Sequence, residues 1–173
     1  YSVLSQPYIH RGSVMLASND RLYALDDWIN YFQGGISSMP THPEVFDLSH
    51  IIFRFSGHKS GQNPHAPLIE PGDGYLYGLA PYGGSNNAGV VYRIRPDGTG
   101  FTVLFNFNKV TDGGYPQGSL VVGTDGLLYG TTSVGGTYNK GTVFSIRTDG
   151  SGYRKLVDFA GGNGSEPWGE VVE

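Results

Sequence analysis

Three kinds of side chain in this sequence could do chemistry. They are histidines, carboxylates, and aromatic rings that occur close to asparagines. A zinc site would need histidines at paired spacing or cysteines, and the chain has no cysteine. No HxH or HExxH pair occurs among the five histidines, which are His10, His42, His50, His58 and His65. The sequence therefore predicts no zinc site.

Aspartates that precede glycine are typical either of calcium loops or of tight turns. They occur in Asp97-Gly98-Thr99-Gly100, Asp149-Gly150-Ser151-Gly152 and Asp112-Gly113-Gly114. None has the spaced acidic ligands of a calcium loop. Hydrogen bonds from the next backbone amides explain an aspartate before glycine. We expect turns and no cofactor, with calcium as the alternative.

A polysaccharide hydrolase or lyase would need two carboxylates that face each other across a cleft. Glu70 and Glu170 are the best placed, because both fall on segments expected to be innermost strands. Nothing in the spacing marks a pair, and there is no G-x-S-x-G nucleophile motif. We predict no catalytic residue and keep a carbohydrate-acting enzyme as the alternative.

Aromatic and amide side chains gather in segments that fall between the expected strands, where we expect loops. Such rings suit the apolar face of a sugar, while amides suit its hydroxyls. The predicted ligand-binding residues are Trp28, Tyr31, Tyr82, Asn86, Asn87, Tyr138, Asn139 and Trp168. The alternative is that these rings only pack the loops onto neighbouring units.

A repeat of 52 residues must position these side chains. Its landmarks recur as Tyr77 and Tyr129, Gly84 and Gly136, Tyr92 and Phe144, and Gly98 and Gly150. A third copy begins at Asp20–Ala24 and is expected to continue through Gly34-Gly35 to a strand at Val45–Leu48. In that alignment the first copy has eight extra residues before the strand and a hairpin six residues shorter after it. Trp28 and Tyr31 lie in the longer loop.

Each copy has four short apolar runs, called A to D, separated by turn residues. Asp-Gly between such runs is a strong hairpin signal, and a period of about 40 to 50 residues with four strands is typical of a β-propeller blade. We predict an all-β propeller of four-stranded antiparallel blades, with about three complete blades, a leading D strand and a trailing A strand. The predicted units are 1–7, 8–57, 58–109, 110–161 and 162–173.

Composition narrows the class of partner. Net charge is −4 and the 11 lysines and arginines are scattered, which argues against nucleic acid. No apolar run approaches the roughly 18 residues of a transmembrane segment. Three blades would leave apolar faces open, so we expect further blades from a longer chain, or self-association.

The motif in Leu128-Tyr129-Gly130-Thr131-Thr132, Gly135-Gly136 and Gly141-Thr142-Val143-Phe144 resembles the bacterial tandem-repeat family called GloVer, of the choice-of-anchor group. The resemblance implies an exported protein, extracellular or at the cell surface. The residues that carry it look like fold makers and imply no activity. The function we expect is therefore a non-catalytic binding or scaffold module for a glycan or protein.

Overall fold

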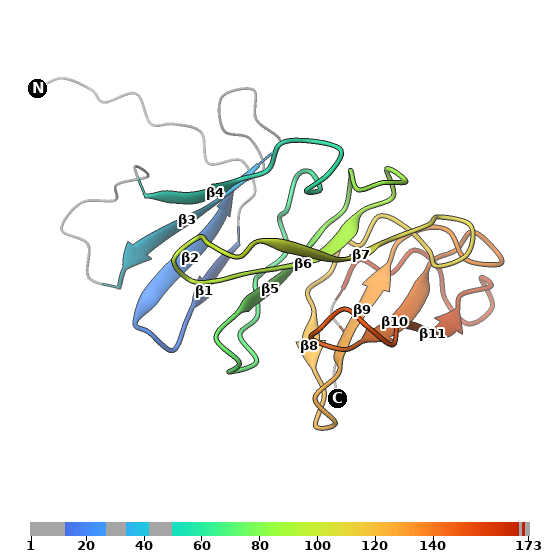
Figure 1. The fold of residues 1–173 in the computed structure, drawn as a ribbon. Coiled ribbons are helices and arrows are strands. Elements are labelled where there is room, and N and C mark those ends of the chain that lie inside the picture. Colours follow the sequence, from blue (N-terminus) through green and yellow to red (C-terminus); the bar gives the residue numbers. More distant parts are fainter. Residues whose placement is uncertain (1–12, 27–33, 42–49, 170, 172–173) are drawn as a thin grey trace, which may run out of the picture.

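The computed structural model describes residues 13–26, 34–41, 50–169 and 171. Within these ranges all regular structure is strand, arranged as three antiparallel sheets that follow one another along the chain (Figure 1). These ranges contain no helix able to cross a membrane. The predicted all-β class and the succession of similar sheets are confirmed.

Strand order within each sheet follows chain order. The first sheet contains β1 (Val14–Leu16), β2 (Arg21–Asp26), β3 (Gly35–Pro40) and β4 (Ile51–Arg54). The second contains β5 (Leu76–Ala80), β6 (Val90–Ile94) and β7 (Thr102–Asn106). The third contains β8 (Val121–Val122), β9 (Leu128–Thr132), β10 (Thr142–Ile146) and β11 (Arg154–Asp158). In the second sheet an isolated bridge from Ile69 to Tyr77 stands where β8 pairs with β9 in the third.

The third strand of the first sheet differs from the prediction. β3 pairs with β2 along its whole length, from Arg21 opposite Pro40 to Asp26 opposite Gly35. The B–C connection is therefore only residues 27–34, and the longer connection is residues 41–50, between β3 and β4. β3 therefore takes the place of strand C, so the prediction that strand C is the run 45–48, with eight extra residues before it and a shortened hairpin after it, is wrong. Residues 45–48 themselves lie outside the described residues.

A small residue at the centre of β3 explains this error. In the second and third sheets a ring from strand C covers a glycine of strand B: Tyr92 lies opposite Gly78, and Phe144 lies opposite Gly130. A Cβ on either glycine would overlap that ring. In the first sheet Ser37 stands opposite Ala24. Because β3 lacks the aromatic landmark, the repeat pattern favours the run Val45–Leu48, which contains Phe46, over the true strand.

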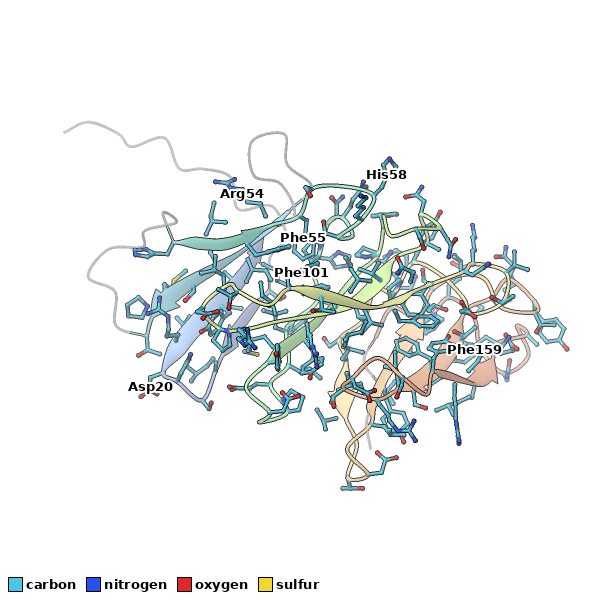
Figure 2. All side chains as sticks on the ribbon, in the orientation of Figure 1. Asp20, Arg54, Phe55, His58, Phe101 and Phe159 are labelled. Carbon is cyan, nitrogen blue, oxygen red and sulfur yellow. The ribbon has the colours of Figure 1, made fainter. Side chains whose placement is uncertain are left out.

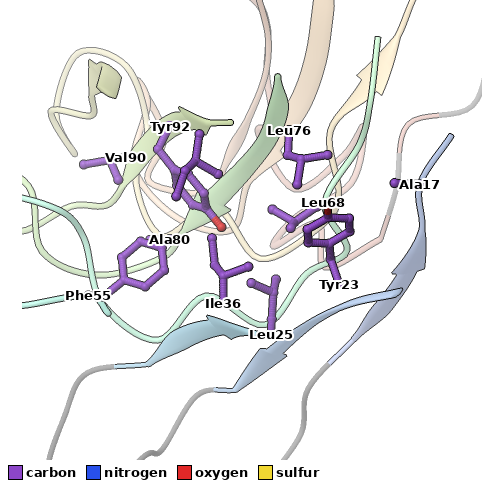
Figure 3. Packing of buried hydrophobic residues seen from close by; sticks show 11 residues of the cluster. Ala17, Tyr23, Leu25, Ile36, Phe55, Leu68, Leu76, Ala80, Val90 and Tyr92 are labelled. Atoms are coloured by element: carbon purple, nitrogen blue, oxygen red, sulfur yellow. The ribbon is translucent and has the colours of Figure 1, made fainter. Parts of the chain in front are cut away.

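Neighbouring sheets pack face to face. The core between the first two sheets includes Tyr23, Leu25, Ile36, Phe55, Leu68, Leu76, Tyr92 and Ile94 (Figure 3). The core between the second and third includes Tyr77, Leu79, Val91, Phe107, Leu120, Leu128, Phe144 and Ile146. β5 is buried at every position because both of its faces are covered. Each fully buried large side chain of this kind stabilises the fold by roughly 1.5 to 3 kcal/mol.

The structure describes only part of the two predicted terminal strands, the leading D strand and the trailing A strand. The leading D strand, predicted within residues 1–7, lies outside the described residues. In the trailing segment, Ser165–Gly169 and Val171 are in no strand, and positions 170, 172 and 173 lie outside the described residues.

Candidate functional site

Two connections between strands B and C, residues 81–89 and 133–141, share one backbone conformation. Each contains an asparagine with positive φ, 52° at Asn87 and 53° at Asn139, a conformation that asparagine tolerates better than most residues. The Asn87 side-chain oxygen accepts a hydrogen bond from the Gly83 amide at 3.2 Å. The Asn139 oxygen accepts one from Gly135 at 3.0 Å. Both asparagines therefore close their own loop.

Further hydrogen bonds tie each loop to strand D of its own sheet. The Ser85 amide donates to the Asn106 side chain at 2.8 Å, and Asn86 donates to the Phe107 carbonyl at 3.1 Å. In the third sheet the Thr137 amide and hydroxyl donate to Asp158 at 3.0 and 2.9 Å. The loops are thus held rigidly against the sheets.

The predicted site residues consequently divide into two groups. The side chains of Asn87 and Asn139 make hydrogen bonds within their own loops, and that of Asn86 makes one to the Phe107 carbonyl beyond strand D, so the ligand contacts of all three stay a prediction. The exposed rings are Tyr82, Tyr138 and Trp168, with exposed fractions of 39%, 59% and 67%. Trp28 and Tyr31 lie outside the described residues.

The D–A connections meet these loops on one rim. Backbone bridges join Gln62 to Tyr82 and Gly114 to Val134. Tyr115 lies between two loops, because its amide donates to the Ala88 carbonyl at 2.9 Å and its own carbonyl accepts from the Ser133 hydroxyl at 2.9 Å. Loops of neighbouring sheets are thereby brought side by side.

Three side chains form a cluster on this rim, which we call the rim patch: Tyr82, Tyr115 and Lys109. The two rings lie with centroids 5.3 Å apart, and the Lys109 ammonium lies 5.0 Å from the Tyr115 ring centroid. A cation over an exposed ring contributes about 0.5 to 1 kcal/mol. The patch presents aromatic surface, hydroxyl groups and one positive charge.

The rim patch departs from the repeat. Val134 stands 52 residues after Tyr82, and Gly161 stands 52 residues after Lys109. The position of Tyr115 has a φ of 54° and corresponds to Asn63, whose φ is 55°. A positive φ strains a bulky residue far more than an asparagine. The repeat therefore does not require these three side chains, and Tyr115 has a backbone conformation that favours asparagine over tyrosine.

The family model of the Gloeobacter/Verrucomicrobia repeat matches residues 7–173, nearly the whole chain. The chain belongs to the Gloeobacter/Verrucomicrobia repeat family. This confirms the resemblance to the GloVer repeats. No curated protein matches this chain.

Two solved structures resemble this Gloeobacter/Verrucomicrobia repeat chain in fold. One is the crystal structure of a nidogen/laminin complex, with 16% identity, a TM-score of 0.57, and coverage of 85% of this chain and 49% of that one. The other is a putative TolB from Agrobacterium tumefaciens, with 12% identity, a TM-score of 0.52, and coverage of 82% and 43%. The chain spans less than half the length of either. At these identities the likeness shows a propeller-like fold alone.

The candidate acid Glu70 joins two units of the repeat. Its carboxylate accepts hydrogen bonds from the Ser18 amide and the Ser18 hydroxyl, both at 2.8 Å. It thereby ties the turn between β1 and β2 to the segment that enters the second sheet. Glu170 lies outside the described residues, so the paired-acid hypothesis stays a prediction.

The repeat aspartates make turn hydrogen bonds. Asp97 accepts from the Thr99 amide and hydroxyl at 2.8 and 2.7 Å, and Asp149 accepts from the Ser151 amide at 2.8 Å. The bonds from Thr99 and Ser151 hold the pKa of each carboxyl below its usual value. Across the described parts of the chain, no three acidic or histidine side chains gather as metal ligands would. Turn formation thus accounts for these aspartates.

Proposed function

We propose that this chain is a non-catalytic, extracellular or surface-attached binding module, and that the rim patch binds a glycan. The three sheets would be consecutive blades of a β-propeller. The face-to-face packing of successive sheets supports the propeller, and the choice-of-anchor resemblance supports export.

One observation carries the choice of site: Tyr82, Tyr115 and Lys109 depart from the repeat and lie together on its loop rim. Loops on a rigid scaffold are where binding residues concentrate. Two rings tilted by 51° form a surface on which the C–H face of a sugar can pack. The tyrosine hydroxyls and the ammonium offer hydrogen bonds to sugar hydroxyls or to an acidic sugar.

A panel of neutral and acidic oligosaccharides, screened by calorimetry or on an array, would test this proposal. Tyr82→Ala and Tyr115→Asn should each weaken binding about tenfold, the equivalent of about 1.4 kcal/mol. Lys109→Gln should weaken acidic sugars more than neutral ones. Asparagine is chosen at position 115 because Asn63 already adopts that backbone conformation.

Leu16→Ala is the matched control, since it shortens another exposed apolar side chain, on β1 rather than on a rim loop. Binding that survives both tyrosine variants would remove the rim patch as the site. A ligand that is a protein instead of a glycan would show as binding in a protein screen with the same dependence on Tyr82 and Tyr115.

A further inference from the structure

The same contacts join the first sheet to the second and the second to the third. The strand-B tyrosine donates to a carbonyl of the next unit's C–D hairpin, Tyr23 to Pro96 at 3.3 Å and Tyr77 to Thr148 at 3.4 Å. Because Pro96 and Thr148 are 52 residues apart, these two bonds are equivalent. Each unit therefore receives the hairpin of the one that follows.

The hairpin lies against strand D of the preceding sheet. A Cβ on Gly98 would overlap Ile52, and a Cβ on Gly150 would overlap Leu104. The aromatic residue after each hairpin stacks on the next position of that strand. These stacked pairs are Phe53 with Phe101 at 4.1 Å and Phe105 with Tyr153 at 4.0 Å.

The third sheet has an apolar surface at the equivalent positions, which we call the end face: Leu156, Val157 and Phe159. Leu156 follows Ile52 and Leu104 in the repeat and is 48% exposed, while Val157 follows Phe53 and Phe105 and is 38% exposed. Phe159 is half-buried, whereas its equivalents Phe55 and Phe107 are fully buried. Figure 2 shows Phe55 beside Phe101 between the first two sheets, and Phe159 on the third sheet.

The segment Glu166–Gly169 is seated against the third sheet as Tyr115–Gly118 is seated against the second. The Glu166 amide donates to the Lys140 carbonyl at 2.7 Å, as the Tyr115 amide does to Ala88 at 2.9 Å. A Cβ on Gly141 would meet Pro167 at 2.7 Å, just as one on Gly89 would meet Pro116 at 2.6 Å. The Thr131 hydroxyl also donates to the Gly169 carbonyl at 3.3 Å.

We propose that the end face docks a further four-stranded repeat unit that continues from the seated segment Pro167–Gly169. Its C–D hairpin, of the type Asp-Gly-x-Gly-aromatic, would lie on Leu156 and place its ring on Val157. This inference rests on the proposed blade architecture and is independent of any ligand.

The first sheet of a second copy fits the end face poorly. No glycine occurs in residues 41–50, which connect β3 to β4, so that connection lacks the Asp-Gly turn. Ser37 also stands where Tyr92 and Phe144 supply a ring to their junctions. The three side chains of the end face, Leu156, Val157 and Phe159, are all apolar, so charge complementarity does not point to a different partner.

An extended chain tests the proposal: residues 1–169 followed by a second copy of residues 119–173, since Gly169 occupies the place of Gly118. Amide exchange in β11 should slow at least tenfold relative to the original chain, and the midpoint of thermal unfolding should rise. Leu156→Glu should abolish both effects in the extended chain while changing little in the original chain, where the side chain is already exposed.

Val157→Phe provides the matched gain-of-contact variant, since it gives the end face the phenylalanine that the other two sheets have at the equivalent positions, Phe53 and Phe105. It should raise the unfolding midpoint of the extended chain and leave that of the original chain unchanged. An added repeat that stays unfolded, or β11 exchange that is unaffected by it, would overturn the proposal. So would Leu156-dependent dimerisation of the original chain in sedimentation or light scattering, because a second copy would then occupy the face. None of these readouts depends on glycan binding, so the two proposals can fail separately.

Discussion

At the scale of single residues, Tyr92 carries a buried polar atom that the fold does not use. Its ring packs against Phe55 and Phe101, and its hydroxyl has no hydrogen-bond partner among the described residues. Burial raises the pKa of this tyrosine. A buried hydroxyl without a partner costs about 1 to 3 kcal/mol, and the equivalent residue of the third sheet is Phe144.

Tyr92→Phe should therefore raise the free energy of unfolding by about 1 kcal/mol, measured by urea denaturation. The reciprocal change, Phe144→Tyr, places a hydroxyl in the equivalent buried position and should lower that free energy by a similar amount. A Tyr92→Phe variant that is less stable than the original chain would mean that the hydroxyl has a partner in solution.

The turn aspartates predict how stability depends on pH. Hydrogen bonds from Thr99 and from Ser151 lower the pKa of Asp97 and Asp149 from the ordinary value of 3.8. The unfolded chain then binds more protons than the folded chain in acid, so this contribution is present above about pH 4 and is lost as pH falls through the folded pKa. Asp97→Asn with Asp149→Asn keeps the acceptor oxygens but should flatten the decline in unfolding midpoint below pH 4. An unchanged acid profile would contradict this.

At the scale of elements, the pair of strands B and C is built around a glycine beneath a ring. A Cβ on Gly130 would come 2.7 Å from the Phe144 ring and 3.2 Å from Leu120. Gly130→Ala should thus lower the free energy of unfolding by about 1 to 3 kcal/mol, the usual cost of overpacking, measured by thermal or urea denaturation. Gly162→Ala is the control, since nothing lies within 4 Å of its Cβ position and it should be nearly neutral.

The same pair of strands shows how far the sequence could predict the elements. Strands B to D of the second and third sheets were predictable because glycine, ring and Asp-Gly turn recur together. β3 was not, since Ser37 and Ala24 replace the ring and the glycine as a pair. The run Val45–Leu48 is richer in strand-forming residues than Gly35–Pro40, and only the register with β2 decides between them.

For the candidate site, sequence predicted the rim but only part of its contents. Tyr82 was identified because aromatic residues in loops stand out. Lys109 was missed, since a lone lysine in a loop has no pattern until its contact with Tyr115 is seen. Asn87 and Asn139 looked like ligand-binding amides, but their positive φ and bonds to Gly83 and Gly135 give them a role in closing the loops.

At the scale of the whole molecule, stability is carried by junctions between neighbouring sheets. The second sheet contributes to both cores, while the first and third sheets each contribute to one of them. In such an arrangement stability is roughly a sum of unit terms and nearest-neighbour interface terms. Replacing a residue should therefore lower the free energy of unfolding more where its junction with a neighbouring sheet is occupied than where the equivalent face is open.

Phe55, Phe107 and Phe159 occupy one position of the repeat and test this directly. Phe55 and Phe107 are fully buried in the two junctions, so replacing either with alanine should cost about 3 to 5 kcal/mol in urea denaturation. Phe159→Ala, on the end face, should cost about 1 kcal/mol in the same experiment. In the extended chain the cost of Phe159→Ala should rise toward that of Phe107→Ala, because the ring would then be buried between two units. Equal costs at all three positions in the original chain would show that its end face is already covered.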